Sequence, residues 1–322
     1  MSKLDELIQS ITKDHVYIQM HNYPDQDALA SAFGLQVLLA DREIKSTICY
    51  SGQIDKHNTL KMIEFLKITI YNNEEFEMDG EDEIILVDGQ MGNVNMINFI
   101  GRKIACIDHH PMQEVSEYRF YDIQSHIGAC SSLIASYFID NQIEISKETA
   151  TALVYGIKMD TADLTRRTSE LDIDMFCQLY KIADKNILSR LESSSLRKKD
   201  LLAYQEAISN LRLHGRIGIA RIGDDCSEAI IGSISDFLLT LAEVDFTLVY
   251  SYRVGGLKFS VRSESKAVDA GKIIKEALLG IGDGGGHATM AAGFLPNLNT
   301  EQEIEAMGQL VEYRVIELVM NN

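Results

Sequence analysis

The sequence predicts an α/β protein of two domains. The chain has 322 residues, whereas a typical domain has about 150. Short β-rich runs alternate with longer helical patterns, which favours a parallel sheet with helical crossovers. Only three prolines interrupt these patterns, and hydrophobic residues make up 46% of the chain. This composition is that of a globular protein and excludes a disordered or collagen-like chain.

The first half of the chain contains four predicted strands and several helices. The last two of these strands are uninterrupted apolar runs, as expected for strands that are covered on both faces. We therefore expect an N-terminal domain, residues 1–188, with a parallel sheet flanked by helices. The strands are predicted over 16–20, 46–50, 84–87 and 104–107, and the helices over 28–39, 131–140, 147–158 and 172–184.

A polar, serine-rich stretch over 189–200 separates two differently patterned regions, and we place a linker over 189–210. The remaining residues, 211–322, are expected to form a smaller α/β domain with a mixed sheet. A Gly-Gly pair at 255–256, between two β-rich runs, indicates a hairpin. Strands are predicted over 217–222, 246–252 and 257–261, helices over 234–242, 267–279 and 301–320, and a glycine-rich loop over 280–286.

The formal net charge of −18 argues against duplex nucleic acid as a partner. A small anionic substrate would need local cations. Five cysteines without a CxxC pair fit no closed disulfide framework and predict reduced thiols. The first residues lack the features of a secretory signal, and no apolar run approaches the length of a membrane span. We expect a cytoplasmic protein that does not bind a membrane.

Three residues of metal-ligand type lie within seven positions after the first predicted strand: His21, Asp25 and Asp27. Pro24 stiffens this loop and removes a backbone donor. In an extended chain both aspartates would reach a site above the carboxyl end of the strand. Asp27 could instead be the N-cap of the helix that follows, which is a common role for an aspartate in that place.

Two further clusters follow the third and fourth predicted strands. Asp88 comes directly after the third strand, and Asp108, His109 and His110 come directly after the fourth. Ligands of open parallel sheets bind beyond the carboxyl ends of the strands. A single strand-end aspartate is usually a loop residue, and a histidine pair is more often structural. The repetition at three strand ends therefore carries the prediction of a metal site.

Asp160 follows a predicted helix, whose C-terminal dipole disfavours an unpaired carboxylate. This position indicates a compensating cation, and an exposed aspartate in a turn is the alternative. Carboxylates and imidazoles without a thiolate suit Mn²⁺ or Mg²⁺, and two imidazoles favour Mn²⁺. The candidate ligands are His21, Asp25, Asp27, Asp88, His109 and Asp160.

Two patterns in the second domain could bind phosphate. Alternation over 257–263 places Lys258 and Arg262 opposite the apolar residues, where a solvated strand face is the alternative. The run from Gly284 to His287 could cradle a phosphate with its exposed amides, and His287 could donate to it. A plain linker is the alternative for this run.

Taken together, these motifs resemble the DHH phosphoesterase superfamily, which is named for the Asp-His-His run at 108–110. The second half resembles the DHH-associated domain. Length and domain pairing are similar to a branch of oligoribonucleases (nanoRNases) and 3'-phosphoadenosine 5'-phosphate phosphatases, which includes cyclic and linear dinucleotide phosphodiesterases. The matching motifs, in order, are His21-x-x-Pro-Asp25-x-Asp27, Asp88, Asp108-His-His, Gly156-Ile-x-x-Asp160-Thr, Ser260-Val-Arg262-Ser263, and Gly284-Gly-Gly-His287 with Ala291-Ala-Gly293.

The resemblance implies a site for two Mn²⁺ ions, with Mg²⁺ or Co²⁺ as substitutes, in a cleft between the two domains. It also implies that His110 contacts the scissile phosphate or assists the leaving group, and that Asp108 orients a histidine. One ion would be held by His21, Asp25 and Asp88, the other by Asp27, Asp88, His109 and Asp160, and the substrate by Arg262, Ser263, Gly285, Gly286 and His287.

The activity that the resemblance implies is a Mn²⁺-dependent phosphodiesterase, in the form of a homodimer. It would hydrolyse short oligoribonucleotides or linear dinucleotides such as pGpG to mononucleotides with a metal-activated water. A 3'-phosphoadenosine 5'-phosphate (pAp) phosphatase and a cyclic-di-AMP phosphodiesterase are alternatives on the same site. A nucleotide-binding sensor without catalysis is an alternative of a different class. The Gly284–His287 run argues against a family II inorganic pyrophosphatase, whose second domain lacks it.

The sequence departs from this branch at positions that are not ligands. Gln26 stands where the branch usually has glycine, and Arg166 and Arg167 replace a more aromatic stretch. The arginine pair either binds phosphate or a base, or pairs with Glu170 and Asp172 on the surface. These departures affect substrate preference and leave the expected metal ligands intact.

Overall fold

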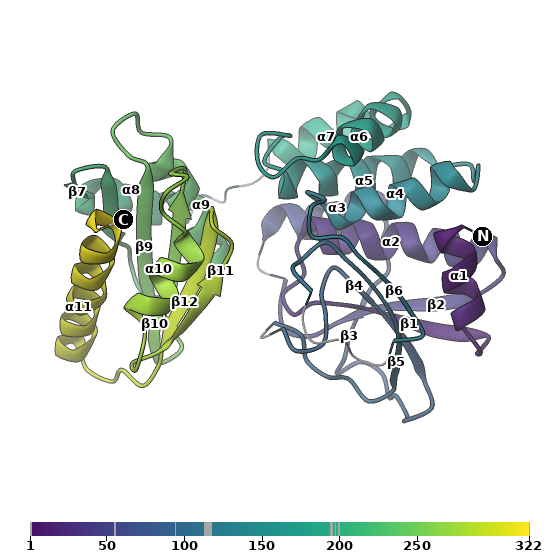
Figure 1. The fold of residues 1–322 in the computed structure, drawn as a ribbon, viewed down its shortest axis with the longest axis horizontal. Helices are drawn as coiled ribbons and strands as arrows, with labels where there is room; N and C mark the ends of the chain where they lie inside the picture. The colour runs from purple at the N-terminus through teal and green to yellow at the C-terminus, as the bar shows by residue number, and fades with distance from the viewer. Residues whose placement is uncertain are drawn as a thin grey trace. The chain divides into compact units, whose positions relative to one another are not determined.

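A computed structural model describes residues 2–54, 56–93, 95–112, 118–193, 196, 198 and 200–321. The chain divides into two compact units, residues 1–195 and 196–322, which run from purple to teal and from green to yellow in Figure 1. Part of the polar stretch over 189–200 lies outside the described residues. Each unit has its own sheet and its own hydrophobic core.

The sheet of the first unit is parallel throughout, as the sequence predicts. Its strands are β1 (His15–Met20), β2 (Lys45–Tyr50), β3 (Tyr71–Asn72), β4 (Glu83–Val87), β5 (Arg102–Asp108) and β6 (Phe120–Ile123). Their order is β3-β2-β1-β4-β5-β6. The strand order reverses between β1 and β4, and at such a switch point the loops after the two strands diverge and leave room for a ligand.

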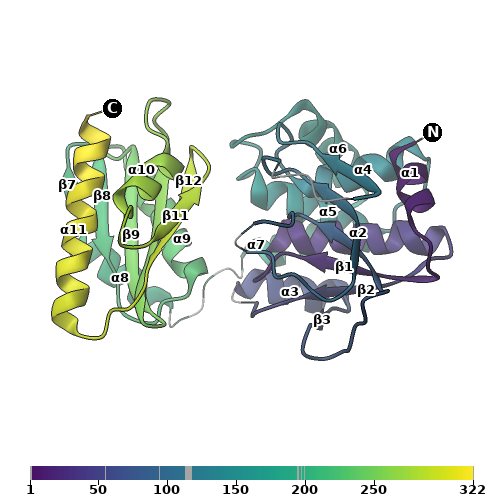
Figure 2. The same ribbon diagram turned by 60° about the horizontal axis from the view of Figure 1, so that its bottom comes forward.

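Helices cover one face of this sheet, as Figures 1 and 2 show. Buried strand residues such as Ile18 and Ile85 share a core with the helices. The opposite face packs against apolar side chains of connecting segments, among them Met96 and Phe99. Both faces are therefore dry, which explains the uninterrupted apolar runs. The helices are α1 (Lys3–Ser10), α2 (Gln26–Asp41), α3 (His57–Leu66), α4 (Cys130–Asp140), α5 (Lys147–Asp160), α6 (Glu170–Ile182) and α7 (Lys185–Glu192).

The second unit contains a mixed sheet of order β11-β12-β10-β9-β8-β7, in which β8 and β9 alone among the described pairs run parallel. Helices α8 and α9 contribute to the core on one face, and α10 and α11 to the core on the other. The elements are α8 (Asp200–Asn210), β7 (Arg212–His214), β8 (Ile217–Arg221), α9 (Glu228–Leu239), β9 (Phe246–Arg253), β10 (Gly256–Ser263), α10 (Ala270–Ala277), β11 (Asp283–Gly286), β12 (Met290–Leu295) and α11 (Glu301–Met320).

Three expectations about the second unit differ from the structure. The interval 189–210, predicted as a linker, contains α8, whose Ala203 and Ala207 pack in the core of this unit. The interval 280–286, predicted as a loop, contains the edge strand β11, which pairs with β12. The face of β10 that holds Arg262 is buried rather than solvated, because α9 covers it.

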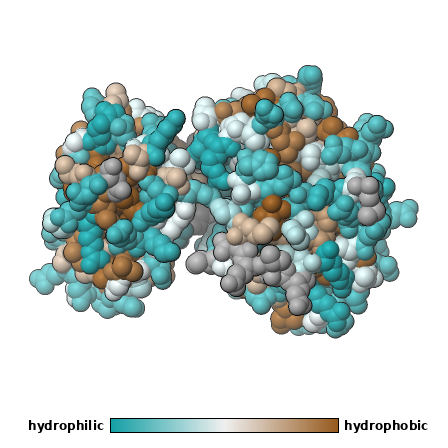
Figure 3. All heavy atoms as spheres, viewed as in Figure 1, coloured by the Kyte–Doolittle hydropathy of each residue, from teal (hydrophilic) through white to brown (hydrophobic). Residues whose placement is uncertain are grey.

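The face of the molecule in Figure 3 is largely hydrophilic, and hydrophobic residues appear there as small groups among polar ones. Single exposed apolar side chains are normal for a folded protein. In the described part of the chain, no helix combines the length and the apolar character that crossing a lipid bilayer requires.

Candidate metal centre

His21 follows β1 directly and points its ring at two carboxylates. Its Nδ1 lies 2.8 Å from the carbonyl oxygen of Asn22; because a carbonyl can only accept, Nδ1 carries the proton. Nε2 therefore presents a lone pair, which is the arrangement of a metal-binding histidine. This atom lies 3.7 Å from Asp88 Oδ2 and 4.0 Å from Asp25 Oδ1.

Asp25 is the N-cap of α2: its Oδ1 accepts hydrogen bonds from the amides of Asp27 and Ala28. The capping role that the sequence left open for Asp27 thus belongs to Asp25. Burial opposes ionisation of Asp25, but Lys56, His21 and the two amides outweigh it and lower its pKa to about 2. This carboxylate stays negative at all ordinary pH values.

Asp27 lies in the first turn of α2 and reaches across to the start of α4. Its Oδ2 accepts from the amide of Cys130 at 2.7 Å, and its Oδ1 accepts from the amide of Ser131 at 2.9 Å. The N-terminal amides of a helix lack partners within the helix and attract a carboxylate. Gly156 of α5 allows this approach, because a Cβ there would overlap Ser131 Oγ and lie 3.0 Å from Asp27 Oδ1.

Asp88 lies between His21 on one side and His109 on the other. It follows β4 with a φ of 57°, a left-handed conformation that is uncommon outside glycine and clusters at functional sites. Its Oδ2 faces His21, and its Oδ1 lies 3.2 Å from His109 Nε2. Within the described residues, Oδ1 is buried and has no hydrogen-bond partner.

His109 and Asp160 complete the second group. His109 Nδ1 lies 3.3 Å from the carbonyl oxygen of Ile127, so Nε2 again presents its lone pair. Asp160, the last residue of α5, places Oδ2 3.3 Å from this atom, and Asp27 Oδ2 lies 4.0 Å from it. Six side chains thus converge at one edge of the sheet, from the ends of β1, β4, β5 and α5 and from the start of α2.

Asp108 organises the turn after β5. Its Oδ1 accepts from the amides of His109 and His110 and from His110 Nδ1 at 2.8 Å. Its Oδ2 accepts from Gln90 Nε2 at 2.7 Å. Asp108 therefore orients His110, as the resemblance implies. Gln90 was not singled out from the sequence, although its place two residues after Asp88 was a signal.

The residues fit a pair of divalent cations. His21, Asp25 and Asp88 form one group, and Asp27, His109 and Asp160 form another, with the possible ligand atoms of each group within 4.8 Å of one another. Burial and the neighbouring carboxylates raise the pKa of Asp27 well above its usual value, and the pKa of Asp160 is also raised. Both shifts express crowded negative charge, which cations would neutralise.

Arg262, predicted to bind substrate, is 8% exposed and already paired within its own unit. Its Nε lies 2.5 Å from Asp236 Oδ1 of α9, and its Nη1 donates to Ser260 Oγ and to the carbonyl oxygen of Val261. Its Nη2 faces Gly232, where a Cβ would approach to 3.2 Å. The guanidinium is therefore rigidly held.

The other predicted substrate-binding residues surround the edge strand β11. Ser263 Oγ donates to the carbonyl oxygen of Val268. Gly285 and Gly286 pair with Ala292 and Ala291 of β12, and the amide of His287 donates to the carbonyl oxygen of Met290. Gly286 has a φ of 145°, a backbone conformation that residues other than glycine rarely adopt. The glycine run is thus built into the sheet.

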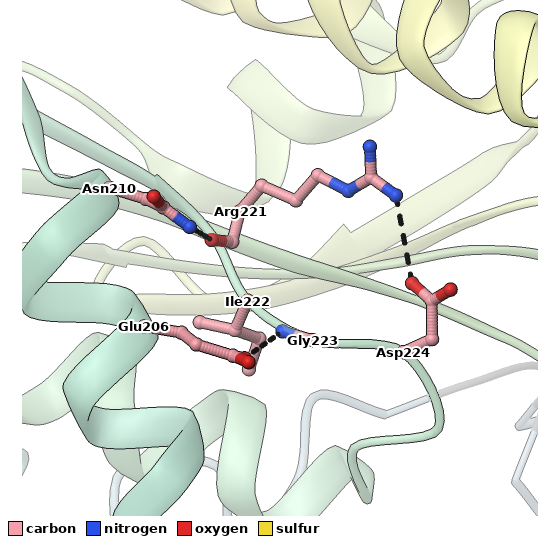
Figure 4. A pocket seen from close by; sticks show the side chains of 6 residues that line it. All are labelled: Glu206, Asn210, Arg221, Ile222, Gly223 and Asp224. Carbon is pink, nitrogen blue, oxygen red and sulfur yellow. Dashed lines mark hydrogen bonds and ion pairs between the residues drawn. The ribbon is translucent and has the colours of Figure 1, made fainter.

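A shallow pocket of the second unit, shown in Figure 4, contains none of the predicted site residues. Glu206 accepts a hydrogen bond from the amide of Gly223, and Asn210 donates to the carbonyl oxygen of Arg221. The Arg221 guanidinium pairs with Asp224 and with Glu301. Because these polar groups pair with one another, they serve to join α8 to β8.

Comparison with known families agrees with this geometry. Residues 15–157 match the DHH family, N-terminal domain, and residues 214–317 match the DHHA1 domain. The chain carries a DHH domain followed by a DHHA1 domain. The DHH match includes the clusters after β1, β4 and β5, and Asp160 lies three residues beyond it. The DHHA1 match includes Arg262 and the run from Gly284 to His287.

Three relatives define how far the similarity extends. An uncharacterized protein of Methanocaldococcus jannaschii is 30% identical over 93% of this chain and 62% of its own length. The cyclic-di-AMP phosphodiesterase GdpP of Geobacillus thermodenitrificans is 26% identical over 96% of this chain and 48% of its own length. The chain therefore spans about half to three fifths of these two proteins. The structure of an exopolyphosphatase-related protein from Bacteroides fragilis shares the fold, with a TM-score of 0.78 and 18% identity over 98% of this chain and 97% of that one.

The arginine pair after Asp160 does not make the surface ion pairs considered from the sequence. In the described part of the chain, Asp172 is fully buried and accepts bonds from amides and hydroxyl groups. Arg166 instead donates from Nη2 to the carbonyl oxygen of Asp160 at 3.2 Å. This contact caps the C-terminal end of α5, where a positive charge is favourable.

Gln26, the departure in the first motif of the DHH domain, joins three helices. Its Nε2 donates to Asn58 Oδ1 at 2.7 Å and to Thr59 Oγ1 at 2.8 Å, and Asn58 Nδ2 donates in turn to the hydroxyl of Tyr155. The side chain is 1% exposed. It thus replaces the close packing of a glycine with a buried polar network behind the metal centre.

We expect Gln26→Ala to lower the free energy of unfolding by about 1–3 kcal/mol, because it leaves buried acceptors of Asn58 and Thr59 without their donor. Urea unfolding measures this change. Gln36→Ala is the control, since Gln36 makes one bond, to the Ser46 carbonyl, at a partly exposed position; its effect should stay within about 0.5 kcal/mol. Equal midpoints for the two variants would contradict the expectation.

Proposed function

We propose that this protein is a phosphodiesterase that uses two divalent cations, Mn²⁺ in preference to Mg²⁺, to hydrolyse short oligoribonucleotides or linear dinucleotides to mononucleotides. The observation that carries the proposal is the pair of His/Asp groups at the switch point of a parallel sheet, with Asp88 of the first group also facing His109 of the second. Neither group contains a thiolate, and oxygen ligands with one imidazole each suit Mn²⁺.

The residues of the chain divide the work of phosphoester hydrolysis. When bound, the two cations supply positive charge that activates a water molecule and stabilises the attacking and leaving oxygens. His110 stands beside the two groups with 32% of its side chain exposed, and Asp108 fixes its ring. Burial lowers the pKa of His110, but Asp108 and Asp88 more than reverse this and raise it. A protonated His110 can therefore donate its proton to the leaving oxygen.

The DHHA1 domain is proposed to bind the phosphate end of the substrate through Arg262, Ser263, Gly285, Gly286 and His287. The acidic character of the chain is consistent with small substrates, because positive charge is then needed only where the phosphate binds. A cyclic dinucleotide is the second candidate substrate, since the similarity to the cyclic-di-AMP phosphodiesterase GdpP extends over 96% of this chain. A pAp phosphatase remains an alternative on the same site.

A turnover assay with Mn²⁺ tests the proposal. The panel contains linear dinucleotides of each base, a pentaribonucleotide, cyclic-di-AMP, pAp and pyrophosphate, and Asp88→Asn serves as the inactive control. Fastest hydrolysis of linear dinucleotides, absent in the control, is the expected result. Preference for cyclic-di-AMP or pAp would replace the proposed substrate and keep the chemistry. Tight nucleotide binding without any hydrolysis would contradict the proposed enzymatic activity and favour a nucleotide-binding sensor without catalysis.

For the substrate site, we expect Arg262→Ala to raise KM for a 5'-phosphorylated dinucleotide at least about 10-fold, because a bond between charged groups contributes about 1.5–3 kcal/mol. The Mn²⁺ content should not change, since the His/Asp groups found among the described residues all lie in the first unit. Lys258→Ala is the control on the same strand; Lys258 pairs with Glu228. An unchanged KM in the arginine variant would restrict Arg262 to its structural contact with Asp236.

A further inference from the structure

The N-terminus of α4 holds the carboxylate of Asp27 through the amides of Cys130 and Ser131. These two bonds use both oxygens of Asp27, so the position of the helix end sets the position of the carboxylate. The helix itself begins without a local cap: Ala129 stands at the N-cap and has no side chain that could accept a bond. Something else must therefore fix this end of α4.

Asp172, on another helix, holds the turn that leads into α4. It belongs to α6, yet its carboxylate accepts from the amides of Gly128 at 2.8 Å and Ala129 at 3.2 Å. It also accepts from Ser132 Oγ at 2.5 Å, and from the amide and hydroxyl of Ser169 at 2.7 and 2.6 Å. Five donors thus surround a side chain with no exposed surface.

The turn that Asp172 holds is also tightly enclosed. A Cβ on Gly128 would lie 2.7 Å from both Asp172 Oδ2 and Thr161 Cγ2, and 2.8 Å from the carbonyl oxygen of Arg167. Thr161 directly follows Asp160 of the second metal group. A displacement of this turn would therefore shift two neighbouring segments: the start of α4 and the segment that begins at Thr161.

We propose that Asp172 is a positioning residue for the metal centre: it fixes the start of α4, whose amides place the carboxylate of Asp27. The proposal rests on the two-cation site proposed above. Among the described residues, the carboxylate of Asp172 bonds to Gly128, Ala129, Ser132 and Ser169, none of which is a candidate ligand. Residues that orient metal ligands from behind typically change metal affinity by about 10- to 100-fold when they are replaced.

Asp172→Asn tests this role in the full chain. The amide group keeps the size of the side chain but presents N–H groups to some of the five donors, so the start of α4 should shift. The matched control is Asp184→Asn. Asp184 caps α7 through the amides of Asn186 and Ile187, so this control makes the same chemical change at a helix-capping carboxylate outside the metal groups.

Calorimetric titration of the metal-free proteins with Mn²⁺, without substrate, provides the readout. We expect Asp172→Asn to weaken Mn²⁺ binding at least about 10-fold, while Asp184→Asn stays within about twofold of the wild type. Thermal unfolding in chelator shows whether each variant folds, with the larger loss of stability expected for Asp172→Asn, whose side chain has no exposed surface. A folded Asp172→Asn variant with wild-type affinity for Mn²⁺ would overturn the proposal.

Ser132→Ala decides the question if Asp172→Asn does not fold. It removes one of the five donors to Asp172 and should weaken Mn²⁺ binding by a few-fold; unchanged affinity would count against the proposal. Failure of the proposed function is separately visible. A wild-type protein that binds Mn²⁺ but hydrolyses nothing would overturn the phosphodiesterase and leave the role of Asp172 intact. A wild-type protein that binds no Mn²⁺ would overturn both.

Discussion

Asp88→Asn should lower the rate of Mn²⁺-dependent dinucleotide hydrolysis by at least about 1000-fold, which corresponds to about 4 kcal/mol of transition-state stabilisation. The reason is that Asp88 faces both groups, with Oδ2 3.7 Å from His21 Nε2 and Oδ1 3.2 Å from His109 Nε2. If Asp88 serves both cations as proposed, a neutral amide in its place would weaken the binding of both. Single-turnover rates and Mn²⁺ stoichiometry measure the loss.

Asparagine is the informative substitution at this position because Asp88 has a φ of 57°. Asparagine adopts this left-handed conformation more readily than alanine does, so the variant removes the charge without adding backbone strain. Asp140→Ala, at the exposed end of α4, is the control and should retain full activity. An Asp88→Asn protein with more than about a tenth of wild-type activity would show that Asp88 does not bridge two ions.

Mn²⁺ should raise the melting temperature of the metal-stripped protein by about 5–10 °C. A ligand present at about 100 times its Kd stabilises the folded state by about 2.7 kcal/mol, and a unit of this size gains about 2–4 °C per kcal/mol. The physical source is the enclosed negative charge: burial and the neighbouring carboxylates raise the pKa of Asp27 and of Asp160. Differential scanning calorimetry with chelator and with excess Mn²⁺ makes the comparison.

Asp88→Asn is again the control for the stability experiment, and its melting temperature should respond weakly to Mn²⁺. The same titration with Mg²⁺ should give a smaller rise if imidazole ligands favour Mn²⁺. A wild-type melting temperature that is equal in chelator and in Mn²⁺ would mean that the His/Asp groups hold no ion, whatever their likeness to a metal centre.

The strand-end clusters could be predicted because their placement follows from a general property of parallel sheets. The carboxyl ends of parallel strands lie at one edge, so His21, Asp88 and His109 had to meet once the strands were correctly predicted. The structure brings these three together with Asp25, Asp27 and Asp160, which the sequence analysis also named. Their assignment as ligands of two cations is a prediction that the experiments above test.

The local sequence could not show which aspartate of the loop after β1, Asp25 or Asp27, is the helix cap. An N-cap and the residue two positions later look alike in sequence, and the structure makes Asp25 the cap of α2. Asp27 points to α4 because the partner amides, 103 and 104 residues away, lie beside it only in the folded unit. The same holds for the burial of Arg262, which depends on α9 packing over β10.

The sequence by itself determined the two α/β domains, the motifs of both and the His/Asp residues of the candidate centre, because these depend on periodicity and on residue type at strand ends. Short elements such as β3, β6 and β12 were not predicted. Only the tertiary structure decided that Asp88 Oδ2 faces His21 and Oδ1 faces His109. It also showed that residues 283–286 form the strand β11. It alone joined Asp172 to the start of α4. Such contacts arise between segments distant in the chain, where packing, rather than local preference, selects the partner of each buried polar group.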